Sequence, residues 1–551
     1  MHVRRVLPIV VAALALATPP AFAQRGGGDE PAPTPSVQLP PPSEKTMALK
    51  KDVAADVEAR RVFTQQLVDS IFSYSELGFQ ETETQRTLTD TLIREGFDVQ
   101  RSVAGVPTAW IARWGSGKPV IALGTDIDGL PSTNQTPGVL TRKELVPGAP
   151  GHGEGHNAGQ ALIITAALAV KKVMERDKLP GTLMLWPGVA EEALGTKAQF
   201  VRAGMFKDVD AVLFTHVGSE LGTSWGQGGG SGLVSVEYSF VGSSSHAAAS
   251  PWAGKSALDA VELMDVAWNF KREHLRTAQR SHYVITNGGA QPNVVPPNAS
   301  VWYYFRETDY DHIKELWDLG NTMAKAASEM TGTTWSSRVL GSAWPQHGNR
   351  PMAEAMQANI EAVGAPDWSD ADQQFAKAFQ RAMGVTERGL SAQVSQLRGR
   401  EFIPPEQLTG GASDDIGDVM WAVPTITMRF PSNVPGATGH HWTSAVAMAT
   451  PVAHKGATQG AKAYAMTVID LITRPELLKA AHEYFVNVQK APTTYKPLLR
   501  PEDEPAIWLN KETMDQFRPE LRKFYYDPTK YKTYLDQLGV AYPPPMPPAK
   551  Q

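Results

Sequence analysis

Three continuous apolar runs separated by helical patterns constrain the fold of this chain most strongly. They lie in residues 119–131 (PVIALGTDIDGLP), 181–192 (GTLMLWPGVAEE) and 210–218 (DAVLFTHVG). Helical patterns follow the first two runs, at residues 161–177 and 196–206. Strands that are apolar throughout, instead of alternating, are typical of a parallel sheet covered on both faces. The sequence therefore predicts an α/β layer with a mostly parallel sheet.

Ionisable side chains stand where each of these apolar runs ends. Asp126 and Asp128 follow the first run, Glu191 and Glu192 the second, and His216 closes the third. In open α/β sheets, ligands bind at the carboxyl ends of the strands. These side chains are therefore predicted to gather at one edge of the sheet, and their types suit a metal site.

The glycine-rich stretch GAPGHGEGHNAG contains His152, Glu154 and His156 at alternate positions. Each glycine would cost about 1 kcal/mol relative to alanine inside a helix, so the stretch is predicted to be a loop. Asn157 with Gln160 resembles a helix N-cap with its capping-box partner, which predicts a helix that begins just after His156. The stretch taken alone fits a solvated turn as well as a metal site.

The other candidate residues are equally ambiguous when each is considered alone. Paired glutamates usually lie on a solvated face, but Glu191 and Glu192 follow a buried strand, where a metal ligand beside a general base explains them. His216 could be a core-edge histidine, and His440 and His441 could be loop residues. The chain contains no cysteine, so a metal site can use only histidines and carboxylates.

The sequence pattern changes after GQGGGSG, which we interpret as a hinge. The segment LVSVEYSFVG alternates with period two, and a helix, two strands and a further helix follow it. This order predicts a small α+β insertion. The expected segments are a signal peptide (1–23), a disordered linker (24–47), a first α/β segment (48–225), the α+β insertion (226–343), a second α/β segment (344–475) and a C-terminal extension (476–551).

The N-terminus predicts export. Arg4 and Arg5 precede a short apolar run, and an A-x-A site allows cleavage near Ala23. The apolar run is too short for a comfortable membrane span, and without cysteine no lipid anchor is expected. The mature protein should therefore be soluble, and periplasmic or secreted. A formal net charge of −5 gives no broad basic field for nucleic acid.

Eight ordered motifs resemble one enzyme family: TDIDGLP, HGEGHNAG, AEEALG, FTHVG, GSSSHAA, GGAQPNVVP with Arg306, SDDIGDV and GHHW. They resemble the metal-dependent aminoacylase/carboxypeptidase amidohydrolases, in particular the p-aminobenzoyl-glutamate hydrolase branch. The resemblance implies a zinc-peptidase-like three-layer α/β/α catalytic domain that binds two divalent metal ions per subunit. It also implies an inserted ferredoxin-like lid through which subunits form a homodimer or a higher oligomer.

The resemblance also implies roles for particular residues. The implied metal ligands are Glu154 as the bridging residue, His156, Glu192, His216 and His440. The implied catalytic residues are Glu191 as general base, Asp128 as supporting acid and His246, which reaches a partner subunit's site. The implied substrate-binding residues are Asn293 and Arg306.

The chain departs from this branch at Glu154, where the branch usually has cysteine. Carboxylate ligation leaves Zn²⁺, Mn²⁺ or Co²⁺ as expected ions. The expected reaction is hydrolysis of an N-acyl amino acid, with Glu191 taking a proton from metal-activated water and passing it to the leaving amine. The alternatives are a periplasmic metallo-dipeptidase or carboxypeptidase, and a non-catalytic metal-binding homologue.

Overall fold

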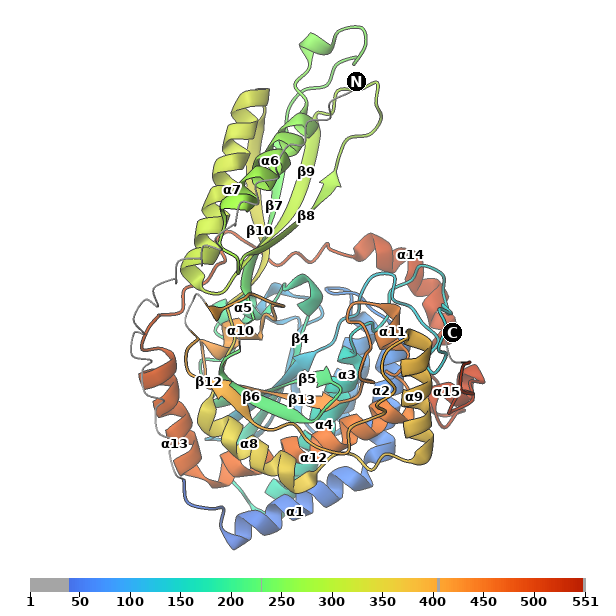
Figure 1. Ribbon diagram of the computed structural model, residues 1–551. Coiled ribbons are helices and arrows are strands. Elements are labelled where there is room, and N and C mark those ends of the chain that lie inside the picture. The colour runs from blue at the N-terminus through green and yellow to red at the C-terminus, as the bar shows by residue number, and fades with distance from the viewer. Residues whose placement is uncertain (1–38, 229, 404–406, 549–551) are drawn as a thin grey trace, which may run out of the picture. The chain divides into compact units, whose positions relative to one another are not determined.

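The computed structural model describes residues 39–228, 230–403 and 407–548 (Figure 1). The predicted signal peptide and most of the predicted linker lie outside these ranges. Helix α1 (Glu44–Ala59) begins within the end of the predicted linker. The Ser43 side chain caps it by accepting a hydrogen bond from the Thr46 amide, and Leu49 and Val53 bury its apolar face. The predicted linker, which ended at residue 47, was therefore four residues too long at its C-terminal end.

The larger sheet has nine strands among the described residues. Its order is β1-β2-β4-β3-β5-β13-β6-β11, with β12 paired to β6. The strands are β1 (Asp98–Arg101), β2 (Trp110–Ser116), β3 (Val120–Asp126), β4 (Gly181–Gly188), β5 (Ala211–Gly218), β6 (Gly222–Gln227), β11 (His347–Gly348), β12 (Arg398–Arg400) and β13 (Thr425–Pro431).

The four central strands of this sheet, β4-β3-β5-β13, are parallel, as the apolar runs predict. Towards the edges, β2 joins β4 and β6 joins β13 in antiparallel pairs, so the whole sheet is mixed. Close packing at the centre depends on Gly124, because a Cβ there would lie 2.3 Å from the Trp186 ring. The α/β fold predicted from the sequence is confirmed.

Helices surround the larger sheet. Helices α4 and α12 contact the central strands, α1 and α2 pack on α4 and α12, α3 contacts β1 and β2, and α8 contacts β6 and β13. The remaining bounds in this region of the chain are α2 (Arg61–Tyr74), α3 (Thr82–Arg94), α4 (His156–Asp177), α5 (Lys197–Arg202), α8 (Arg350–Val363), α9 (Asp370–Met383), α10 (Ile416–Met420), α11 (Trp442–Ala445) and α12 (Pro451–Thr473).

A second, four-stranded antiparallel sheet forms the predicted insertion, labelled β7 to β10 in Figure 1. Helices α6 and α7 both contact its strands β7 and β9. The strand order β10-β7-β9-β8 with two helices is the ferredoxin-like arrangement. The core is aromatic, with Tyr238, Trp268, Tyr303 and Phe305 fully buried. The elements are β7 (Gly232–Val241), α6 (Ala257–Lys271), β8 (Arg280–Asn287), β9 (Asn298–Glu307), α7 (Tyr310–Thr331) and β10 (Thr334–Ala343).

The C-terminal segment after α12 packs along the rest of the chain. Its helices are α13 (Pro475–Tyr484), α14 (Lys511–Leu521) and α15 (Tyr534–Leu538). The Tyr495 hydroxyl donates to Asp418 Oδ1 at 2.7 Å, and the Val339 amide of β10 donates to Asp503 at 3.0 Å. The segment thus contacts both sheet-bearing regions. None of the helices in the described residues has the length and apolar character that a membrane span requires.

Candidate metal centre

The turn after β4 presents Glu191 and Glu192. It is bounded by Ala190 and Leu194, whose φ angles of 53° and 52° lie in the left-handed region that non-glycine residues seldom adopt. Such residues cost on the order of 1–3 kcal/mol each and persist where the surroundings determine them. The Ala190 amide is held by the Glu81 carboxylate at 3.0 Å. The strained turn therefore fixes where both glutamates point.

His156 is the first residue of α4, and the helix start differs from the prediction. The N-cap is Gly155 with φ 123°, and a Cβ there would lie 2.4 Å from Met448 Sδ, so only glycine fits. Asn157 and Gln160 lie inside the helix, where both side-chain amides donate to backbone carbonyls of other elements. The predicted capping box is therefore wrong, because tertiary contacts use both side chains.

Asp128 orients the His156 ring. His156 Nδ1 lies 3.1 Å from the Asp128 carbonyl and 3.3 Å from Asp128 Oδ1, while the other Asp128 oxygen accepts the Glu192 amide at 3.1 Å. This leaves His156 Nε2, which is buried, without a hydrogen-bond partner among the described residues, 3.9 Å from Glu191 Oε2. A histidine held by a carboxylate through one nitrogen and open at the other is the usual arrangement of a metal ligand.

Glu154 places its two oxygens against two different histidines. Oε1 lies 3.3 Å from His216 Nε2, and Oε2 lies 3.0 Å from His440 Nε2. His440, at φ 53°, also lies 3.3 Å from Glu192 Oε2. Burial raises the pKa of Glu154, but the His440 hydrogen bond and the neighbouring histidines outweigh it, so the net pKa is lowered. Glu154 therefore lies between the two histidines with its ionised form favoured, which suits a carboxylate that binds metal.

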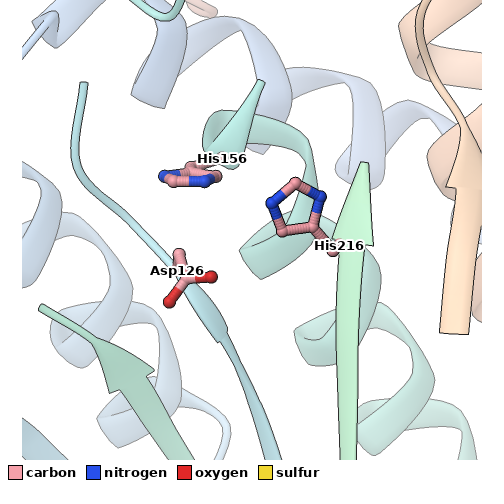
Figure 2. Close-up of side chains that lie close together, drawn as sticks. All are labelled: Asp126, His156 and His216. Carbon is pink, nitrogen blue, oxygen red and sulfur yellow. The ribbon is translucent and has the colours of Figure 1, made fainter. Parts of the chain in front are cut away.

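Asp126 is a further donor at this site. Figure 2 shows its carboxylate below the His156 and His216 rings, and ligand atoms of the three residues lie within 4.8 Å of one another. Its Oδ2 is buried, and no residue in the described part of the chain forms a hydrogen bond with it. Glu154, His156 and Glu192 form an overlapping group of the same kind. Carboxylates and imidazoles in two overlapping groups fit a pair of divalent ions.

Buried acidic groups continue beyond these ligands, and one lysine compensates them. Lys197, fully buried at the start of α5, donates to Asp126 Oδ1 at 2.6 Å and to Asp415, and its Nζ lies 3.6 Å from Asp414. Asp414 and Asp415 also lie within 4.8 Å of Glu191. Lys197 was not predicted from the sequence, because α5 also contains Gln199 and Arg202, so one more polar residue gave no distinct signal.

The electrostatics of the turn favour proton uptake. Burial and the charges of Asp414, Asp126 and Glu192 raise the pKa of Glu191, and Lys197 offsets only some of this. Burial also raises the pKa of Glu192. Metal ions bound among these carboxylates would favour their ionised forms. The cluster therefore has an excess of negative charge that divalent cations would balance.

Comparison with known proteins agrees with this geometry. Residues 122–450 match the family described as Peptidase family M20/M25/M40. The chain belongs to this family. It is 33% identical over 449 residues to one of the subunits of p-aminobenzoyl-glutamate hydrolase from Escherichia coli (strain K12), and the match covers 78% of this chain and 92% of that protein.

This family member is also similar to a human dipeptidase in sequence and to a solved bacterial structure in fold. The chain is 28% identical over 427 residues to the Xaa-Arg dipeptidase of Homo sapiens, covering 76% of this chain and 87% of that protein. A solved structure from methicillin resistant Staphylococcus aureus, named as an aminohydrolase, matches with a TM-score of 0.53 at 16% identity, covering 77% of this chain and 100% of that one. This family member is a metal-dependent amide hydrolase.

Two predicted histidines of the family member lie apart from the ligand cluster. His152 is buried with Nε2 3.1 Å from the Ile71 carbonyl, it belongs to none of the candidate metal-binding groups among the described residues, and burial lowers its pKa to about 3. His441 caps α11 and contacts Thr443, whereas its neighbour His440 contacts Glu154 and Glu192.

The insertion does not bring its three predicted site residues together within one chain. The β7–β9 register pairs Gly232 with Glu307 and Val241 with Asn298. Arg306 is therefore at one end of the sheet, where it donates to Ser413 at 2.9 Å. His246 and Asn293 lie beyond the other end, exposed. At about 3.3 Å per residue the two ends are about 25 Å apart. Arg306 and Asn293 of one chain cannot hold the same carboxylate.

Proposed function

We propose that this chain hydrolyses the amide bond of N-acyl amino acids whose acyl group is aminobenzoyl, aryl or aminoacyl. The observation that carries the proposal is the buried Glu191 beside a cluster of two carboxylates and three histidines. The similarity to p-aminobenzoyl-glutamate hydrolase supports this substrate class.

The residues of the site have separate tasks. Glu154, His156, Glu192, His216 and His440 would hold two divalent ions, which supply a Lewis acid and lower the pKa of water. Glu191 would take a proton from the attacking water and return it to the leaving nitrogen, because its carboxylate lies beside the ligand cluster, 3.9 Å from His156 Nε2. Asp128 keeps the His156 ring in place through Nδ1.

Substrate recognition is proposed to require a second subunit. Arg306 is half-buried, its Nε has no hydrogen-bond partner among the described residues, and it lies at the end of the insertion that contacts Ser413. His246 and Asn293 are exposed at the other end, where a hydrogen bond from the Ala247 amide to the Asn293 carbonyl joins their loops. In a dimer formed through the insertion, these two residues would reach the metal centre of the other subunit.

We also propose that the protein is exported, with cleavage near Ala23. The support is the sequence pattern of the first 23 residues. Detection of the mature N-terminus in the periplasmic or secreted fraction would test this proposal, and an intact N-terminus retained with the cytosol would contradict it.

A dipeptidase activity is the second candidate. The similarity to the human Xaa-Arg dipeptidase favours it, and it would use the same metal centre. Comparing kcat/KM for aminobenzoyl-glutamate, other N-acyl amino acids and dipeptides separates the two candidates. About two bound metal equivalents are expected, and a purified protein that binds none when reconstituted would support a non-catalytic homologue.

Glu191→Gln tests the proposed mechanism. The amide cannot accept a proton, so kcat/KM should fall by about 10²–10⁴-fold, the usual contribution of general acid–base catalysis. Metal content should stay at the wild-type value, because the proposed ligand set does not include Glu191. Activity on the best substrate and metal content by mass spectrometry are the measurements.

Glu175→Gln is the matched control, because Glu175 lies exposed on α4 and pairs only with Lys171 among the described residues. It should leave both measurements unchanged. Near-normal turnover by metal-loaded Glu191→Gln would show that Glu191 is not the general base.

A further inference from the structure

A cavity of about 190 Å³ lies directly beside the candidate metal ligands. Two of its walls are Glu154 and His216, and the end of β5 and the loop after β13 form most of the rest. The volume is smaller than the roughly 300–1,000 Å³ of clefts that enclose a drug-sized ligand. It therefore suits one end of a substrate whose amide bond lies at the metal centre.

Arg429 lines this cavity and has a defined direction. On β13 it is the register partner of His216 on β5, and register partners on neighbouring strands point to the same face of a sheet. Its Nη1 lies 3.1 Å from His216 Nδ1 and donates to the Val217 carbonyl at 3.3 Å. These contacts hold one corner of the guanidinium against the cavity wall.

The remaining nitrogens of the Arg429 guanidinium can donate hydrogen bonds to a ligand. Within residues 39–228, 230–403 and 407–548, neither Nε nor Nη2 of Arg429 makes a hydrogen bond, and no carboxylate forms an ion pair with it. The side chain is exposed. Glu154, the acidic residue of the cavity wall, has its oxygens directed at His216 and His440 instead. The cavity therefore has an uncompensated positive charge a short distance from the metal centre.

We propose that Arg429 binds a carboxylate of the substrate in this cavity and so selects amides of amino acids that carry a free carboxylate. The inference rests on the proposed amide hydrolysis and adds its specificity. A planar guanidinium can grip a carboxylate with two parallel N–H donors, which a lysine cannot do. Ser219 and Asn433 add polar groups to the wall beside Arg429, and Val217 and Val434 add apolar ones.

The carboxylate can come from two places in such a substrate: the α-carboxylate of the leaving amino acid, or an acidic side chain. Two substrate pairs distinguish them. N-benzoylglycine against N-benzoylglycinamide removes the α-carboxylate, and N-benzoylglutamate against N-benzoylglutamine removes only the side-chain carboxylate. The ratio of kcat/KM within each pair measures how strongly the enzyme selects for that charge.

Arg429→Gln should lower one of these ratios by about 10–100-fold, the range expected for a hydrogen-bonded charge pair. The same ratio for Arg429→Lys should lie between those of Arg429→Gln and the wild type, because lysine keeps the charge but lacks the two parallel donors of a guanidinium. Arg113→Gln is the matched control. Arg113 pairs with Asp208 on the surface, and three strands separate β2 from β13, so its ratios should equal those of the wild type.

Equal losses on the charged and the neutral member of both pairs would overturn the inference, because they would mean that Arg429 only supports His216. Metal content of each variant is measured alongside. If the wild type hydrolyses none of the four compounds, the proposed function fails, and calorimetry then tests Arg429 separately. The inference is supported if the metal-loaded wild type binds N-benzoylglycine or N-benzoylglutamate more tightly than its neutral partner and Arg429→Gln loses this preference. Equal binding of the charged and neutral compounds by the wild type overturns it.

Discussion

At the scale of single residues, the Lys197 ammonium joins three segments of the chain that meet beneath the metal centre. It contacts Asp126 at the end of β3 and Asp415 before α10, while its own backbone amide donates to Asp415 Oδ2 at 3.1 Å. Asp126 then accepts from Lys197 through one oxygen, while its other oxygen lies beside His156 and His216 and has no hydrogen-bond partner within the ranges that the structure describes. Burial raises the pKa of Asp126 and of Asp415, and the Lys197 charge opposes that increase at both carboxyl groups.

Lys197→Met should destabilise the protein strongly. The substitution keeps the length of the side chain but leaves the Asp126 and Asp415 carboxylates buried without their cation, which typically costs about 3–5 kcal/mol. Lys118→Met is the matched control, because Lys118 pairs with Asp210 on the surface, where such pairs contribute about 0–1 kcal/mol. Free energies of unfolding in urea, measured on chelator-treated protein, give both values; similar losses would contradict the prediction.

At the scale of elements, the short strand β11 packs its histidine against α13. His347 is buried, and its Nε2 lies 3.1 Å from the Tyr484 hydroxyl of that helix. Burial lowers the pKa of His347 to about 4. The folded chain therefore keeps this imidazole neutral at a pH where an unfolded chain would protonate it.

This difference predicts a pH dependence of stability. Between pH 6.5 and about 4 the unfolded chain binds a proton at His347 that the folded chain does not, so acidification lowers the free energy of unfolding by up to about 1.4 kcal/mol per pH unit. The contribution is complete above about pH 6.5. His347→Gln removes it, so the wild type should lose more stability than the variant from about pH 7 to about pH 4.5 in urea titrations. A difference between the two that does not change with pH would contradict the assignment.

The elements themselves were largely predictable, and the physical reason is burial. Central parallel strands are apolar throughout, so β3, β4 and β5 were visible as runs ending in Asp126, Glu191 and His216. The start of α4 was predicted to within one residue, but its capping was not, because Asn157 makes contacts that no local pattern encodes. Arg429 had a signal, a lone charge inside VPTITMRF, but its meaning depends on the register that places it beside His216.

At the scale of the whole molecule, the insertion separates residues that the motif order suggested would act together. Arg306 is near the Gly232 end of β7, and His246 follows the Val241 end, because β7 and β9 pair over their full lengths. No sequence pattern showed this, since the distance depends on register and strand length. A single chain therefore cannot provide both ends of the insertion to one metal centre.

Two inactive variants should restore activity when mixed. Glu191→Gln chains keep His246, and His246→Ala chains keep Glu191, so a mixed dimer would have one complete site formed by Glu191 of one chain and His246 of the partner subunit. After dissociation and random reassociation in equal amounts, about a quarter of wild-type activity is expected. No recovery, with mixed dimers verified by differently tagged chains, would contradict the shared site.

The pairing of β7 with β9 has a genetic consequence. In a dimer that shares its sites, a chain with a defective exposed tip would silence the metal centre of the normal chain it joins, while its own metal centre would be completed by the normal tip. Such a mutation, like one that damages a metal centre, would therefore reduce activity only in proportion to gene dose. A chain that carries both defects would leave the mixed dimer without a complete site, so it alone should be dominant.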